Sequence, residues 1–280
     1  WLLTRQESFA QQALAEMRQT TLPKAGSRFW TTYAGWALAF DWLGEHPAFD
    51  ASLKDRVAQQ LLDAAIATAA TPDLQHPDQA SYHNYTTRFL GLTTFTICAV
   101  AKWRPDDPRV KDLKDKCARA FQNILQVSNL VSPKGSYHES MDYMRISYVP
   151  MAMLAELQRT TTGVDPALRF GTYKSFADTY LYKLMPDGTP SREGDNEYPI
   201  LDDRDTVALG YAVNRFKNPY AAWLLRNSGF AVQQWALPVL DFLWNDPDVS
   251  PCSPAVTHPE ELPLHRHFTG VDQVVFRDNW

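Results

Sequence analysis

Hydrophobic residues recur along the chain with the period of an α-helix, and the helical segments alternate between two kinds. Residues 85–100 represent the first kind, which is apolar on nearly every side and rich in Thr and aromatic residues. Residues 110–125 represent the second kind, in which the apolar residues follow one side of the helix. Helices that are apolar all round are buried, whereas amphipathic helices lie at a surface. The pattern therefore predicts an inner and an outer layer of helices.

The amphipathic segments share a helix-start signal. Each begins with Asp or Asn, whose side-chain oxygen accepts a hydrogen bond from a free backbone amide, and Pro often follows at the first helical position. The four starts are Asp50, Asp107, Asp165 and Asn218. The apolar segments before them predict helices at residues 31–43, 85–102, 140–161 and 206–216. The repeating unit is a helix pair of about 55 residues, which indicates a helical array. We expect an all-α fold whose pairs close into a double-layered ring, an (α/α) toroid.

The last part of the chain has a different pattern. Residues 250–267 are rich in Pro and His, and residues 270–280 have the β-branched and aromatic composition of a strand. A lone terminal strand cannot pair its backbone, so we expect it to be the first strand of a β-domain that this chain lacks. The predicted organisation is a toroid catalytic domain at residues 1–249, then a linker and the start of a β-sandwich-like domain at residues 250–280. Because the chain opens on Trp1 in a helical pattern, we also expect the true N-terminus to lie upstream.

Composition excludes several classes of protein. With 280 residues, of which 45% are hydrophobic, the chain can bury one large core. No apolar run reaches the roughly 18 residues of a membrane-spanning helix, so no span is expected. The net charge of −5 argues against nucleic acid as a partner. The three cysteines lie far apart without metal-ligand spacing, so we expect neither a disulfide framework nor a cysteine metal site.

The first candidate site lies at the start of an apolar helix, in residues 81–88. His83 and Asn84 are adjacent there and can both hydrogen-bond a carboxylate or an oxyanion, and Arg88 follows one turn later. The alternative is structural, because either His83 or Asn84 can simply cap the helix.

The second candidate site, residues 135–146, has the densest set of titratable groups in the chain. Glu139 and Tyr143 are spaced for one helix face, and His138 and Arg145 lie close by. The alternative is a helix capped by Ser140, with Tyr143 in the core and its hydroxyl hydrogen-bonded.

The third candidate site is the polar loop at residues 185–197, which contains Arg192, Glu193 and Asp195. A solvated turn is the alternative, because the Pro-Asp-Gly at residues 186–188 is typical of turns. All three candidate sites occur at the junction that leads into an apolar helix. In a ring of helix pairs such junctions gather on one rim, so we expect the three segments to converge on one cleft.

These segments resemble motifs of the heparinase II/III-like family of polysaccharide lyases and the related oligoalginate lyases. Residues 82–84 resemble the family's His or Asn-His motif, although Tyr82 stands where many relatives have Asn. Residues 135–143 resemble its Gly-Gly-x-x-x-x-Ser-x-x-Tyr stretch, and residues 192–195 resemble its Gly-Asp loop. The spacing of Gly270, Arg277 and Trp280 is similar to the first strand of its β-domain. The resemblance implies an incomplete (α/α) toroid followed by β-sheet domains.

The activity implied by the resemblance is β-elimination at a uronic acid, which leaves an unsaturated uronide. The proton at C5 lies α to a carboxylate, so the enzyme has to neutralise that carboxylate, remove the proton and protonate the leaving oxygen. Asn84, His83 and Arg192 are the candidates for neutralisation. Tyr143 resembles the catalytic tyrosine and is the candidate acid, base or both, with His83 as the competing base.

The remaining polar residues are expected to bind substrate or to adjust the reacting groups. A cation beside Tyr143, either Arg145 or a protonated His138, favours its phenolate, and Glu139 orients one of the reacting groups. Trp36 represents the aromatic residues that can stack on sugar rings, although at helical spacing such residues more often belong to the core.

The resemblance further implies an anionic polysaccharide as partner, such as a glycosaminoglycan or alginate, and a periplasmic or secreted location. No cofactor is evident in this chain, and in some relatives the β-domain holds a structural zinc. Two alternatives stay open. One is a toroid glycoside hydrolase, which needs two carboxylates from the set Glu139, Asp142, Glu193 and Asp195. The other is a non-catalytic carbohydrate-binding protein.

Overall fold

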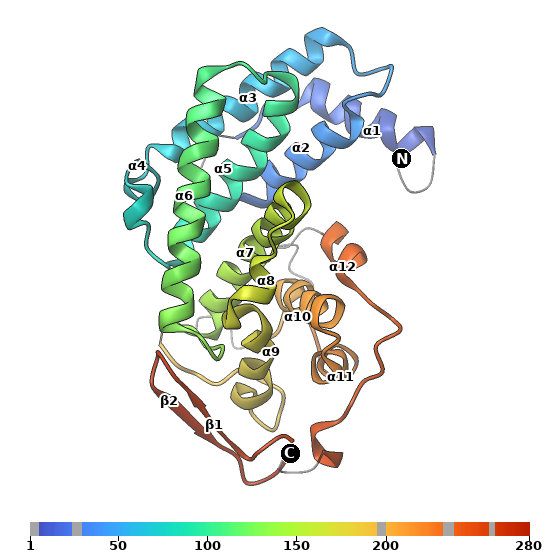
Figure 1. The fold of residues 1–280 in the computed structure, drawn as a ribbon. Helices are drawn as coiled ribbons and strands as arrows, with labels where there is room; N and C mark the ends of the chain where they lie inside the picture. Colours follow the sequence, from blue (N-terminus) through green and yellow to red (C-terminus); the bar gives the residue numbers. More distant parts are fainter. Residues whose placement is uncertain (1–5, 24–29, 195–199, 232–237, 258–260) are drawn as a thin grey trace. The chain divides into compact units, whose positions relative to one another are not determined.

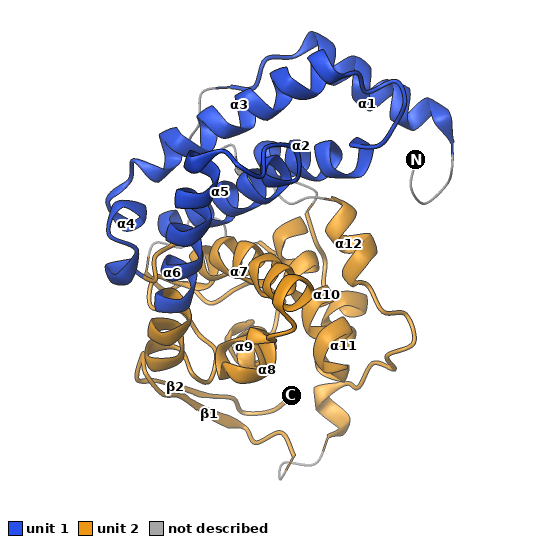
Figure 2. Ribbon diagram, turned by 45° about the horizontal axis from the view of Figure 1, so that its top comes forward, with its two compact units in different colours: residues 1–81, 85–123 blue, residues 82–84, 124–280 orange. Residues whose placement is uncertain are grey.

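The computed structural model describes residues 6–23, 30–194, 200–231, 238–257 and 261–280. These residues are mostly helical, with one two-stranded sheet near the C-terminus, which confirms the all-α class (Figure 1). None of the described helices is both long and apolar enough to cross a membrane. The chain divides into two compact units (Figure 2). Unit 1 comprises residues 1–81 and 85–123, and unit 2 comprises residues 82–84 and 124–280.

Unit 1 contains the two helix pairs predicted from residues 31 and 85 onward, together with short helices that were not predicted. Its helices are α1 (Glu7–Gln19), α2 (Trp30–Leu43), α3 (Ala51–Ala69), the short α4 (Pro72–Gln75) and η2 (Pro77–Gln79), most of α5 (Asn84–Trp103), and the first part of α6 (Pro108–Val131). Helix α3 packs against α1, α2 and α4. Its apolar side is fully buried, as Val57 and Leu61 illustrate.

Unit 2 contains the remaining elements. They are α7 (Met141–Thr162), α8 (Pro166–Arg169), α9 (Gly171–Lys183), α10 (Asp203–Phe216), α11 (Pro219–Asn227), α12 (Pro238–Trp244), η3 (Pro254–Val256), β1 (His265–Phe268) and β2 (Gln273–Phe276). Helix α10 packs against α7, α9, α11 and α12 (Figure 1). Its central Tyr211 is completely buried and meets the rings of Tyr148 and Trp244.

The predicted caps are confirmed at all four outer helices. Asp50 accepts a hydrogen bond from the Leu53 amide at 2.8 Å, and Asp107, Asp165 and Asn218 accept equivalent bonds at 2.9 to 3.0 Å. The third outer helix differs from the expectation because it is broken into α8 and α9. A Cβ atom at Gly171 would lie 2.6 Å from the carbonyl oxygen of Pro133, so the chain at the break passes too close to its neighbour for a larger residue. The closure of the pairs into a toroid stays a prediction, as does the domain boundary at residues 249 and 250.

The C-terminal strand is confirmed at Gln273–Phe276, but it is not alone. It pairs antiparallel with His265–Phe268 in the register His265 to Phe276, and that strand begins within the Pro- and His-rich segment at residues 250–267. The two strands form a hairpin, so the backbone of residues 273–276 is paired within this chain.

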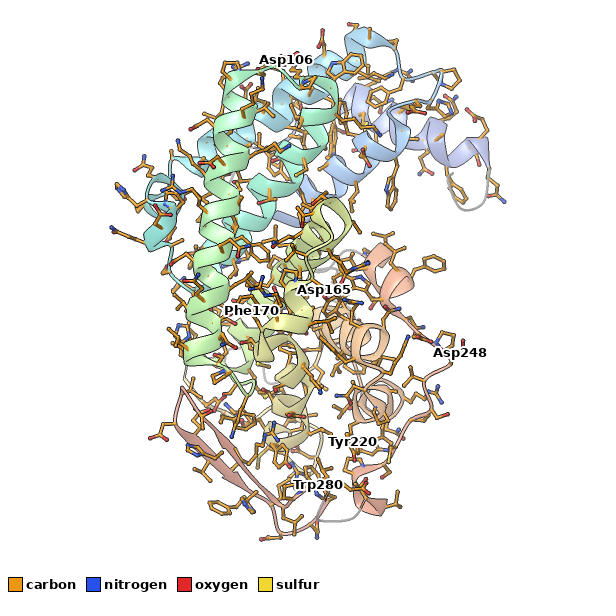
Figure 3. All side chains as sticks on the ribbon, in the orientation of Figure 1. Asp106, Asp165, Phe170, Tyr220, Asp248 and Trp280 are labelled. Atoms are coloured by element: carbon orange, nitrogen blue, oxygen red, sulfur yellow. The ribbon has the colours of Figure 1, made fainter. Side chains whose placement is uncertain are left out.

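The three residues of the β-strand pattern attach this hairpin to the helices of unit 2. Gly270 has φ +98°, and a Cβ atom there would lie 2.5 Å from the carbonyl oxygen of Val131 at the end of α6. The Arg277 guanidinium donates to the carbonyls of Leu181 at 3.0 Å and Leu184 at 2.8 Å, which end helix α9. The Trp280 ring, which is labelled in Figure 3, packs against the Tyr182 ring of α9 in a T-shaped arrangement with 5.0 Å between the ring centroids. These positions thus have a structural role that their spacing alone does not reveal.

Candidate functional site

The carboxylate of Glu139 is the centre of the candidate site. Its Oε1 lies 3.0 Å from the His83 Nε2 and accepts a hydrogen bond from the Asn84 Nδ2, also at 3.0 Å. Its Oε2 accepts the backbone amide of Asn84, also at 3.0 Å. Since Asn84 is the first residue of α5, Glu139 satisfies an amide at the helix end that no helical carbonyl can reach. The first and second predicted segments are therefore joined through one side chain.

The solvent exposure of these three residues differs. The His83 side chain is 42% exposed and the Glu139 side chain is 17% exposed. Asn84 is buried at 2%. This corrects the expectation that Asn84 faces a substrate carboxylate, because its amide instead binds Glu139 inside unit 2. The group that a ligand can reach in this triplet is the imidazole of His83.

The loop that carries Glu139 has an unusual backbone. Gly135, Ser136 and Ser140 all have positive φ angles, of 82°, 61° and 142°. Such angles are rare for residues with a Cβ atom, and strained positions of this kind are typical of functional sites. Ser140 precedes α7 but makes no side-chain capping bond, so the alternative of a simple Ser140 cap is wrong.

Two tyrosines and a histidine form an aromatic wall beside the carboxylate. The rings of Tyr82 and Tyr137 meet edge to face at 5.0 Å, and the ring of His138 lies 4.5 Å from that of Tyr137. Burial raises the pKa of both tyrosines well above the usual value, so neither is a phenolate at neutral pH. Burial lowers the pKa of His138, although the charge of Glu139 opposes that effect. His138 is therefore a poor source of the positive charge that was predicted to favour a phenolate.

The third predicted segment contacts the second through Gly194. At φ +56°, a Cβ atom on Gly194 would lie 2.7 Å from the carbonyl oxygen of Glu139. The preceding Glu193 binds the Lys183 ammonium at 2.6 Å, and Arg192 is exposed. Asp195 lies outside the described residues. Residues 82–84, 136–139 and 193–194 of the three segments are thus in contact, whereas their convergence on one cleft stays a prediction.

A large open cavity of about 1330 Å³ lies next to this third segment. It is lined by the end of α9, the loop after it, α11 and the C-terminal residues 273–280. Among the described residues, its wall includes Arg192 and Glu193 but not His83 or Glu139. Arg192 and Glu193 therefore line a cavity to which His83 does not contribute.

Arg145 does not have the role predicted for it. Its side chain is 2% exposed, and its guanidinium binds Asp142 at 2.9 Å and Asp205 at 2.6 Å. It also donates to the carbonyl of Ile200 at 2.8 Å. Because these carboxylates occupy the guanidinium inside the protein, it is a structural link between α7 and α10. The pKa of Arg145 is raised, since the attraction of the carboxylates outweighs the effect of burial.

Tyr143, Arg88 and Trp36 are the other predicted residues, and all three are partly exposed. Tyr143 lies in the first turn of α7 with its side chain partly exposed. Arg88 and Trp36 belong to unit 1, on α5 and α2, and both are partly exposed. The Arg88 guanidinium lies 4.7 Å from the centre of the Tyr85 ring. A role of Arg88 and Trp36 in the site stays a prediction.

Lys183 and Gln273 are polar residues near the site that the sequence did not single out. Lys183 is a single basic residue among apolar residues at a helix end, and Gln273 lies in an alternating strand. Neither carries a motif, but a charged residue in an apolar stretch is a signal of a buried ion pair. Within the described parts of the chain, no group of three or more His, Cys, Asp or Glu side chains is arranged to hold a metal ion.

Comparison with models of known protein families finds no match, and comparison with curated proteins finds none either.

Proposed function

We propose that the protein is a polysaccharide lyase that cleaves a uronic-acid-containing polysaccharide by β-elimination. The observation that carries the proposal is the close approach of the partly exposed His83 ring to Glu139, with 3.0 Å between Nε2 and Oε1. A histidine oriented by a carboxylate is a common general base. The resemblance of residues 82–84, 135–143 and 192–195 to the lyase motifs supplies the reaction class.

The orientation of His83 suggests how it would act as a base. In a neutral ring whose Nε2 donates to Glu139, Nδ1 carries the lone pair that accepts a proton. Glu139 fixes that tautomer and stabilises the imidazolium that forms. We assign removal of the C5 proton to His83 and protonation of the leaving O4 to Tyr143, whose phenol is a donor at neutral pH.

The substrate carboxylate also needs a partner. Asn84 is buried against Glu139, and Arg145 is occupied by carboxylates inside the protein. Arg192 is the exposed cation among the predicted residues of unit 2, so we assign neutralisation of the substrate carboxylate to it. Because Arg192 lines the large cavity and His83 does not, this assignment requires a uronate that extends from the cavity to His83. A guanidinium forms two parallel bonds with a carboxylate, which suits a planar uronate group.

The proposal includes the wider context that the resemblance implies. The helix pairs would form an incomplete (α/α) toroid, followed by a β-sheet domain that begins with the hairpin and holds a structural metal in some relatives. The partner would be an anionic polysaccharide such as a glycosaminoglycan or alginate, degraded in the periplasm or outside the cell.

The hydrolase alternative has less support. It needs two accessible carboxylates, but Asp142 is buried at 4% against Arg145 and Arg204. Glu193 is paired with Lys183. Of the described candidates, this leaves Glu139, which is hydrogen-bonded to His83 and Asn84. Nothing specific favours a non-catalytic binding protein.

The test is a panel of uronic acid polysaccharides, assayed for the ultraviolet absorbance of an unsaturated product. We expect one polymer to give product, and His83→Gln and Tyr143→Phe each to lower kcat about 100-fold or more. Arg169→Met, which changes an exposed residue away from the site, serves as the control. Cleavage without the absorbing product, retained by Tyr143→Phe and lost in Glu139→Gln, would contradict the lyase proposal and favour a hydrolase.

A further inference from the structure

The buried ammonium of Lys183 joins three separate segments of unit 2. Lys183 is the last residue of α9, and its side chain is 2% exposed. Its Nζ donates to the Ser136 Oγ at 2.7 Å, to the Glu193 Oε1 at 2.6 Å and to the Gln273 Oε1. A lysine ammonium has three donors, so all of them are used.

The acceptors also bind one another. The Ser136 Oγ donates to the Gln273 Oε1 at 2.9 Å, and the Gln273 Nε2 donates to the Glu193 Oε2 at 3.3 Å. We call these four residues the lysine junction: Ser136, Lys183, Glu193 and Gln273. Burial lowers the pKa of Lys183, and the bond to Glu193 opposes that shift. Since a buried charge is tolerated only when it is paired, the geometry of the junction is tightly specified.

Two residues of the lysine junction lie next to the backbone that holds Glu139. Ser136 is in the same strained loop, three residues before Glu139, and its amide donates to Thr179 at 2.6 Å. Glu193 directly precedes Gly194, which packs against the Glu139 carbonyl. The junction therefore holds both the loop before Glu139 and the segment at Gly194 that packs against the Glu139 backbone. Gln273 brings the C-terminal hairpin into the same network.

We propose that Lys183 is a positioning residue for the His83 and Glu139 pair, and that Gln273 makes the docked hairpin part of the site. This inference rests on the proposed lyase function for its kinetic consequence. Lys183 does not touch the reacting atoms. It acts by holding the loops around Glu139, because displacement of a catalytic group by about 1 Å can lower a rate about 100-fold.

The test separates positioning from simple stability. Lys183→Met leaves Glu193 without its partner, so it is compared with the double variant Lys183→Met, Glu193→Gln, which removes both charges. Lys174→Met changes an exposed lysine of the same helix and is the matched control. Each protein is measured for urea stability, for kcat and KM on the uronate polymer, and for the ¹⁵N resonances of the His83 ring.

We expect the double variant to regain most of the stability lost in Lys183→Met, while kcat stays about 10-fold to 100-fold below the wild type and KM changes less than about threefold. In Lys183→Met and in the double variant, the ¹⁵N chemical shift of the His83 Nε2 should move away from the value of a hydrogen-bonded nitrogen. If kcat recovers together with stability, or if the His83 resonance is unchanged, the positioning role is refuted. The resonance decides this even when the wild type cleaves no uronate polymer, an outcome that refutes the lyase function instead.

Discussion

Replacement of Glu139 by Ala tests the centre of the candidate site directly. The change removes two hydrogen bonds from Asn84 and the polar contact with His83, each 3.0 Å long. A hydrogen bond to a charged group contributes about 1.5–3 kcal/mol when it is fully buried. Because the Glu139 side chain is 17% exposed, water compensates for part of the lost hydrogen-bond energy. We therefore expect the free energy of unfolding to fall by about 3 kcal/mol.

A double-mutant cycle isolates one of these bonds. Asn84→Ala removes the side-chain donor and keeps the backbone amide, so it should cost about 1–2 kcal/mol. Each single variant breaks the bond between the Asn84 and Glu139 side chains, and the double variant breaks the same bond once. The decreases in unfolding free energy of the two single variants should therefore sum to about 1 kcal/mol more than the decrease in the double variant. Urea denaturation followed by tryptophan fluorescence measures all four proteins. Glu261→Ala, which changes an exposed glutamate of the same unit, should shift the free energy by less than about 0.5 kcal/mol.

Two results would refute this reasoning. If Glu139→Ala behaves like the Glu261→Ala control, the carboxylate contributes no net stability and the bonds to α5 do not form in solution. If the losses of the single variants add within about 0.3 kcal/mol, the Glu139 and Asn84 side chains are not coupled.

Three further predictions test other parts of unit 2. Arg145→Met should destabilise the protein by about 3–5 kcal/mol in urea, because it strands buried carboxylates, whereas Arg169→Met should have little effect; equal stability of the two would contradict the buried network. Gly270→Ala should speed amide hydrogen exchange in the hairpin about 30-fold or more, because the added Cβ is strained at positive φ and overlaps the end of α6. Gly229→Ala, whose added Cβ would meet open space, should leave the exchange rate unchanged. An unchanged rate in Gly270→Ala would contradict the docking of the hairpin. The lowered pKa of His138 means that the unfolded chain binds more protons below pH 6.5, so stability should rise with pH up to about 6.5 and level off above it. His138→Gln should flatten this rise in denaturation curves, and an undiminished slope would assign the effect to another group.

The helical part of the fold could be predicted because its signals are local. The side chains of Asp50, Asp107, Asp165 and Asn218 cap helices within three residues of their own positions, so spacing alone locates them. Of the two hairpin strands, only the one within residues 270–280 was predicted. The strand at residues 265–268 was missed because it is short and rich in His and Arg. The hairpin contacts α6 and α9 through residues that are far apart in the sequence, and no local pattern encodes these contacts.

The candidate site could be predicted at the level of segments but not of roles. The spacing of the repeat indicated which segments would meet, and Glu139 does bind His83 and Asn84. The direction in which a side chain points depends on partners that are distant in the sequence, as Arg145 illustrates. Its neighbour Asp142, three residues away, was visible in the sequence, but Asp205, which draws the guanidinium inward, lies 60 residues further along the chain.

The crowding of titratable groups in residues 135–146 has two separate causes, which helix geometry distinguishes. Asp142 and Arg145 are three residues apart on one face of α7, and that face is buried against α10. Glu139 precedes the helix and turns toward His83, while Tyr143 remains partly exposed. Part of the crowding therefore serves the core, and the proposed elimination depends on the groups that solvent reaches, which are His83, Tyr143 and, from the third segment, Arg192.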